Sequence, residues 1–153
     1  MFEWLEATSL SVWVREAQTI WAFPMILTLH TFGLALLVGG SVVIDLRLLG
    51  IGRQMPVAPL RMLFRVVWAG FWLSLITGST LFAAYATMRG TSPVFYAKLL
   101  FVALGVSTVV LIRRAVFDVP AEIAATGSVK LMALLSLAAW TAAITTGRLL
   151  AYL

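Results

Sequence analysis

The chain has 153 residues, of which 62% are hydrophobic and only 11% are charged, and its mean hydropathy is +1.04. A soluble domain of this length is about half apolar and about a quarter charged, so this composition predicts an integral membrane protein. The net charge of +5 does not indicate nucleic acid as a partner, because the basic residues lie beside apolar stretches. Cysteine is absent, which excludes disulfides, thiolate metal sites and iron–sulfur clusters.

The N-terminal segment, residues 2–16, predicts a short amphipathic helix that lies in the membrane interface. Leu5 and Trp13 fall on its apolar face, and Glu3 and Glu6 lie away from the centre of that face. The two glutamates also stand where a signal peptide would carry basic residues. We therefore do not expect a cleaved signal here.

Four long apolar stretches follow, and each predicts a membrane-spanning helix of about 20 residues. They cover residues 21–44, 66–86, 94–112 and 131–150. The connections between them are short, so consecutive spans are expected to be antiparallel neighbours. The predicted fold is all-α: an integral membrane four-helix bundle with a short N-terminal amphipathic interfacial helix, in which residues 1–153 form a single domain.

The basic residues predict the orientation in the membrane. Those beside the first-to-second and third-to-fourth connections are Arg47, Arg53, Arg61, Arg65, Arg113, Arg114 and Lys130. The opposite side holds the remainder, which are Arg15, Arg89, Lys98 and Arg148. Cytoplasmic loops carry an excess of Lys and Arg, so the N-terminus and the C-terminus are both expected outside.

The lone histidine, His30, is the only strong ligand in the chain for a soft metal or a haem iron. It follows Trp21 by nine residues, or roughly 13 Å along a helix. An ionisable side chain within a span is costly and marks a candidate functional site. Gly33, on the same face, leaves space for a flat macrocycle such as haem or for a neighbouring helix. The alternative for His30 is a neutral ring hydrogen-bonded to Ser74, to Thr77 or to another helix.

Two cations in the outer half of the spans, Lys98 and Arg148, run against the general charge distribution. Above a buried imidazole, they would hold an anionic group such as the propionates of haem, a quinone or a lipid headgroup. The alternative is that both side chains extend to lipid phosphates, as long basic side chains readily do.

Other features are interpreted as structural. Residues 70–78 (Gly-xxx-Ser-xxx-Gly) and 139–147 (Ala-xxx-Ala-xxx-Gly) form stripes of small residues, which are typical of helix–helix contacts in membranes. Asp45, at the end of the first span, is expected to form an ion pair with Arg65 or Arg113.

Three segments resemble a family of uncharacterised four-span bacterial inner-membrane proteins: residues 21–50, 68–84 and 92–105. The first ends in DLRLLG, and the third contains the F-x-x-K motif at Phe95–Lys98. The resemblance implies a multi-pass protein of the bacterial inner (cytoplasmic) membrane. The plan is also distantly similar to CopD-type copper-resistance membrane proteins and to HemJ-type protoporphyrinogen oxidases. These likenesses imply that His30 and Lys98 are the functional polar positions.

Members of these groups often carry a further histidine, which this chain lacks. A haem held by two histidines of one protomer is therefore excluded, which leaves two protomers, a methionine or a five-coordinate iron. We favour binding of haem b through His30 for redox or electron-transfer chemistry in a homo-oligomer, with Gly33 giving room and Lys98 and Arg148 holding the propionates. The alternatives are a non-catalytic subunit of a larger membrane complex and CopD-like copper uptake or handling with His30 as metal ligand. Whether the protein is an enzyme is left open.

Overall fold

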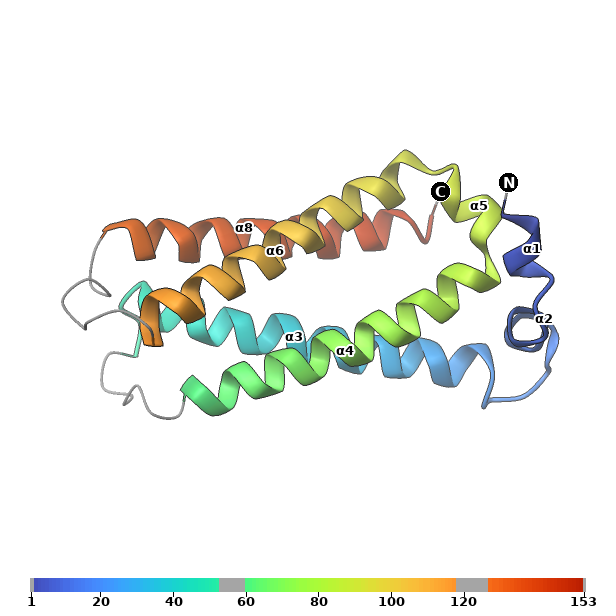
Figure 1. The fold of residues 1–153 in the computed structure, drawn as a ribbon, viewed down its shortest axis with the longest axis horizontal. Helices are drawn as coiled ribbons and strands as arrows, with labels where there is room; N and C mark the ends of the chain where they lie inside the picture. The colour runs from blue at the N-terminus through green and yellow to red at the C-terminus, as the bar shows by residue number, and fades with distance from the viewer. Residues whose placement is uncertain (1, 53–59, 118–126, 153) are drawn as a thin grey trace.

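Four long helices form a bundle in the computed structural model, which describes residues 2–52, 60–117 and 127–152 (Figure 1). They are α3 (Phe23–Leu48), α4 (Leu60–Ala84), α6 (Pro93–Phe117) and α8 (Gly127–Leu149). Each is long and apolar enough to cross a membrane. The described residues contain no strand. The predicted all-α four-helix membrane bundle is confirmed.

The helices extend beyond the predicted spans at the end of the bundle where the connections α3–α4 and α6–α8 lie, hereafter the loop end. The spans were expected to end at 44 and 112, but α3 continues to Leu48 and α6 to Phe117. Arg47 and Arg114 lie in these last turns. A helix does not have to end where the hydrocarbon ends, because its polar turns can continue into the headgroup region. Arg53 lies outside the described residues.

The bundle consists of two helical hairpins. α3 packs closely on α4, α6 packs closely on α8, and a contact between α3 and α8 joins the two pairs. Backbones meet where α3 crosses α4, since a β-carbon built on Gly70 would lie 2.5 Å from the Leu37 amide nitrogen and 2.7 Å from the Gly33 carbonyl oxygen. The small-residue stripe of α4 therefore packs helices, as predicted. Ala139 and Ala143 of the α8 stripe are likewise buried inside the bundle.

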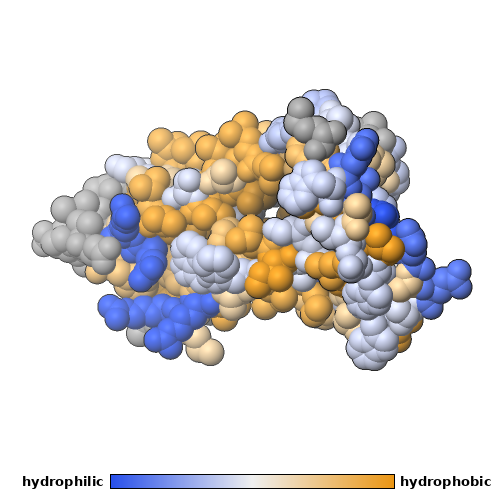
Figure 2. Space-filling model, turned by 45° about the vertical axis from the view of Figure 1, so that its right-hand side comes forward, coloured by the Kyte–Doolittle hydropathy of each residue, from blue (hydrophilic) through white to orange (hydrophobic). Residues whose placement is uncertain are grey.

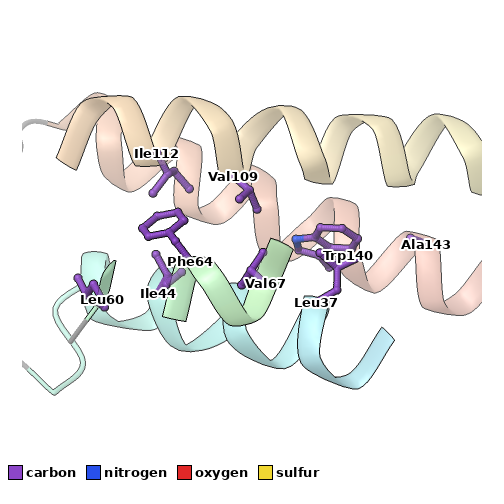
Figure 3. Close-up of a cluster of buried hydrophobic side chains, with 9 residues drawn as sticks. All are labelled: Leu37, Ile44, Leu60, Phe64, Val67, Val109, Ile112, Trp140 and Ala143. Atoms are coloured by element: carbon purple, nitrogen blue, oxygen red, sulfur yellow. The ribbon is translucent and has the colours of Figure 1, made fainter. Parts of the chain in front are cut away.

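A cluster of buried apolar side chains holds the four helices together (Figure 3). Trp140 of α8 is the largest of them and covers Gly105 of α6, where a β-carbon would come within 2.8 Å of the indole. Because lipid is as apolar as these side chains, the cluster stabilises the bundle through close packing rather than through exclusion of water. Its members are Leu37, Ile44, Leu60, Phe64, Val67, Val109, Ile112, Trp140 and Ala143.

The opposite end of the bundle, hereafter the terminal end, carries both termini and three short helices, α1 (Glu3–Glu6), α2 (Ser9–Glu16) and α5 (Ala86–Gly90). The single helix predicted for residues 2–16 is thus two helices, because the Thr8 side chain caps α2 by accepting a hydrogen bond from the Ser11 amide at 3.4 Å. In Figure 1, α2 is seen almost end-on, so it crosses the direction of the bundle.

The N-terminal helices are attached to the bundle by polar bonds. Arg15 Nη1 donates to the carbonyl oxygens of Ala84 at 2.9 Å and of Glu6 at 3.1 Å. The Thr87 amide donates to Glu6 Oε1 at 2.7 Å. Segments far apart in the sequence are thereby tied together across the terminal end.

The surface of the bundle is apolar between two hydrophilic ends, as Figure 2 shows. Large side chains such as Phe32, Trp72 and Ile76 are exposed on the long helices. A soluble protein rarely exposes a continuous apolar surface of this size, whereas lipid requires one. The fold therefore defines a multi-pass α-helical membrane protein.

Candidate functional site

The imidazole of His30 lies between α3 and α4 in the terminal half of the bundle and is half-buried. Its Nδ1 atom is 3.1 Å from Thr77 Oγ1. The ring also covers Gly78, where a β-carbon would come within 2.9 Å of His30 Cε1. Thr77 thus gives the ring a polar partner, and Gly78 leaves the room for Cε1 to approach α4.

The hydrogen bonds of Thr77 define which ring nitrogen of His30 carries the proton. The Thr77 hydroxyl donates its single hydrogen to the Leu73 carbonyl oxygen at 2.6 Å, so toward His30 it can only accept. We infer that Nδ1 carries the proton and that Nε2 keeps a free lone pair.

The space beside Gly33 is filled by α4. A β-carbon built on Gly33 would lie 2.5 Å from Ser74 Oγ and 3.1 Å from the Gly70 carbonyl oxygen. Gly33 was expected to leave space either for a flat macrocycle or for a neighbouring helix, and the structure shows a neighbouring helix there. The glycine that borders the imidazole is Gly78, from the stripe on the second span.

Lys98 also points into the bundle. Its side chain is half-buried and runs along Gly147 of α8, with Lys98 Cε 3.6 Å from the position of a β-carbon there. Arg89 reaches the same end of α8, since its guanidinium donates to the Leu150 carbonyl oxygen. No carboxylate among the described residues forms an ion pair with Lys98. His30 and Lys98 both lie in the terminal half of the bundle, near the starts of α3 and α6.

Arg148 is the other cation expected at this site, and its role there stays a prediction. It is exposed on α8, one residue after the glycine that Lys98 covers. A further cation at the terminal end is Arg89 of α5, whose Nη1 atom donates to the Leu150 carbonyl oxygen at 2.9 Å. The charge distribution placed Arg89 on the same side of the membrane as Lys98, but not next to α8, because its path depends on the turn at Tyr85. Thr77 was foreseen only as a structural partner of His30.

The ion pair expected for Asp45 is not formed, so that prediction is wrong. Neither Arg65 nor Arg113 pairs with Asp45, which is 1% exposed and lies beside Ser136 of α8. Neither Asp45 Oδ2 nor Ser136 Oγ has a hydrogen-bond partner. Asp45 follows Ser41 by one helical turn and so faces the interior, whereas both arginines are exposed.

The site offers one neutral nitrogen ligand and a cation to a bound group. Within residues 2–52, 60–117 and 127–152, no three His, Cys, Asp or Glu side chains come together as a metal site would require. A bare metal ion would therefore have to bind through His30 and ligands of other kinds. A haem iron, which already has the porphyrin nitrogens, needs only one or two protein ligands.

Compared with known families, curated proteins and solved structures, the chain gives no match. The resemblance to four-span inner-membrane proteins and the likenesses to CopD-type and HemJ-type proteins stay predictions.

Proposed function

We propose that this membrane protein binds haem b through His30 for redox or electron-transfer chemistry. The observation that supports the proposal is the hydrogen bond of 3.1 Å between His30 Nδ1 and Thr77 Oγ1. With Nδ1 as the donor of this bond, Nε2 would be the atom that binds the iron. Histidines that bind metals are held in the same way, with the second ring nitrogen donating to an oxygen.

The residues of the site have separate roles in this proposal. His30 Nε2 would be the axial ligand, Thr77 orients the ring, and Gly78 leaves the space in which the ring lies. Lys98, whose side chain runs along Gly147 of α8, would provide positive charge for the anionic edge of the macrocycle. Haem bound there would supply one-electron chemistry.

A single histidine per chain leaves the sixth position of the iron open. Either the iron is five-coordinate, or a second protomer contributes its own His30. We propose a homo-oligomer for this reason. The membrane is proposed to be the bacterial inner membrane, with the terminal end outside, because the exposed Arg61, Arg65, Arg113 and Arg114 gather at the loop end.

The test is the absorption spectrum of the protein purified in mild detergent after expression with ample haem, oxidised and then reduced with dithionite. We expect a Soret band and reduced α and β bands that disappear in His30→Ala. Thr31→Ala is the matched control, since the Thr31 hydroxyl bonds only to the Leu27 carbonyl oxygen of its own helix. Thr77→Val should weaken haem binding by about 10–100-fold, and Thr77→Ser should restore it. A wild-type protein without a chromophore, or a His30→Ala variant with an unchanged spectrum, would refute the proposal.

A second candidate function, a non-catalytic subunit of a larger complex, is favoured by a groove on α8. The groove has a volume of about 540 Å³ and is lined by Leu137, Ala138, Thr141, Ala142, Thr145 and Thr146. Small side chains on a lipid-facing helix permit another helix to approach closely. Ala142→Phe would fill the groove, so such a complex should dissociate during gentle solubilisation. Leu104→Phe, at an exposed position of α6, is the control and should leave the complex intact. Equal complex sizes for both variants would contradict a partner at this groove.

A further inference from the structure

At the loop end, the beginning of α4 contacts the end of α6 around one aromatic ring. The Arg61 guanidinium of α4 lies over the Phe117 ring of α6, 5.1 Å from its centre. One turn further along α4, Phe64 meets the same ring edge-on, with the two ring centres 5.6 Å apart. These contacts join the two helical hairpins along a line, hereafter the α4–α6 seam, on which Arg61 lies exposed.

Two more arginines come to this seam from α6. Arg113 and Arg114 precede Phe117 by four and three residues, and residues at these spacings are neighbours on one side of a helix. Both side chains are exposed. Three guanidinium groups from two hairpins are therefore grouped about the Phe117 ring.

The structure describes no carboxylate that balances these charges. Across residues 2–52, 60–117 and 127–152, none of the three arginines pairs with an acidic side chain, and the ion pair Arg15–Glu16 lies at the terminal end. Asp45, the acidic residue described in the loop-end half, is buried inside the bundle. Like charges at the edge of a membrane repel one another more strongly than in water, because lipid lowers the dielectric constant. The group of arginines is therefore expected to take an anion from its surroundings.

The surface beside the seam is apolar, which restricts the kind of anion. Leu111, one turn deeper than Arg114 on α6, is exposed. Figure 2 shows hydrophilic side chains gathered at the loop end with apolar surface directly beside them. An anion at this boundary meets headgroups on one side and hydrocarbon on the other, so it needs apolar chains of its own. Basic pockets between membrane helices bind anionic lipid headgroups in this way.

We propose that Arg61, Arg113 and Arg114 bind the phosphate of an anionic phospholipid at the α4–α6 seam. Guanidinium groups form charge-assisted, often bidentate hydrogen bonds with phosphate. The Phe117 ring holds the Arg61 guanidinium in place, so this cation loses little freedom when the lipid binds. A lipid bound by arginines of both hairpins would also hold the hairpins together. The site lies in the opposite half of the bundle from His30 and does not depend on the haem function.

The experiment titrates phosphatidylglycerol or phosphatidylcholine into delipidated protein in dodecylmaltoside and counts the bound lipids by native mass spectrometry. An arginine near an anionic lipid contributes about fivefold in affinity, so wild type should prefer phosphatidylglycerol by about tenfold or more. Arg61→Gln and Arg113→Gln should each reduce this preference about fivefold. Lys130→Gln is the matched control, because it removes one exposed positive charge at the same end from α8, outside the seam. Unfolding by SDS without added lipid shows that each variant is folded.

Three outcomes would overturn the lipid site. The first is equal affinity of wild type for the two lipids. The second is an equal loss in Lys130→Gln and Arg61→Gln, because the attraction would then come from the net charge of the loop end. The third is displacement of phosphatidylglycerol by excess inorganic phosphate, but not by sodium chloride of the same ionic strength, which would assign the arginines to a soluble anion.

A conservative variant tests whether the guanidinium group itself matters. Arg61→Lys keeps the charge but loses the planar fork and its stacking on Phe117, so it should keep only part of the preference for phosphatidylglycerol. An undiminished preference in Arg61→Lys would show that charge alone suffices and would overturn a site formed by guanidinium groups.

Discussion

Replacement of Gly70 by alanine tests the closest contact in the fold. The new β-carbon would lie 2.5 Å from the Leu37 amide nitrogen and 2.7 Å from the Gly33 carbonyl oxygen. Ordinary contacts of this kind are about 3.5 Å long, so α3 and α4 must separate by about 1 Å. A gap of this size forfeits up to half of each contact energy of about 0.1–0.2 kcal/mol, which over roughly 40 atom pairs gives a loss of roughly 3 kcal/mol.

Gly39→Ala is the matched control for this substitution, because a β-carbon on Gly39 of α3 would meet nothing within 4 Å. Both variants gain up to about 1 kcal/mol of helix propensity, so this term cancels in the comparison. We expect the unfolding free energy of Gly70→Ala to lie roughly 3 kcal/mol below that of Gly39→Ala, within the range known for overpacked sites. Unfolding by SDS in dodecylmaltoside micelles, followed by tryptophan fluorescence, measures the difference. Equal midpoints for the two variants would refute the glycine-mediated contact between α3 and α4.

Three further variants test the site and its surroundings. Gly78→Ala would place a β-carbon 2.9 Å from His30 Cε1 and displace the ring, so haem affinity by titration should fall about tenfold; an unchanged affinity would show that the ring does not need this space. Ser136→Ala removes a buried hydroxyl without a partner, and its unfolding free energy should stay constant or rise by up to about 1 kcal/mol; a clear decrease would reveal a hydrogen bond at this position. Arg15→Gln loses the 2.9 Å bond to the Ala84 carbonyl oxygen, and limited proteolysis should then cut the N-terminal segment faster; an unchanged cleavage rate would mean that this bond does not hold the segment.

The fold was predictable because length and hydropathy determine it almost alone. A span of about 20 apolar residues can satisfy its backbone in lipid only as a helix. Sequence could not show where α3 ends, since Arg47 continues the helix past the hydrocarbon. The break between α1 and α2 was missed for another reason. Thr8 is a good N-cap residue, but the amphipathic pattern of residues 2–16 continues through it.

The residues of the candidate site were harder to predict from the sequence than the fold was. His30 was found because a lone imidazole in a span is costly whatever its neighbours are. Lys98 was found because it runs against the charge distribution. The positions of Arg89 and Arg148 required the path of the chain, since both lie on the same side of the membrane in the predicted orientation. Arg148 follows Gly147, and when that glycine faces Lys98 the next residue is turned by about 100° to the outside.

The same rotation accounts for Asp45. Its neighbours on α3, Leu37 and Ser41, are buried against the second hairpin, so a carboxyl on that face meets Ser136 of α8 instead of a basic loop. Its negative charge alone suggested an arginine as the partner of Asp45. The residues available to a side chain are, however, those on the helix that its own face packs against. The carboxyl is buried where α3 meets α8, and its Oδ2 atom and the Ser136 hydroxyl beside it both lack a hydrogen-bond partner, which is costly for polar groups removed from water. The loop-end half of the bundle thus contains a polar contact between hairpins, and the terminal half contains His30 and Lys98.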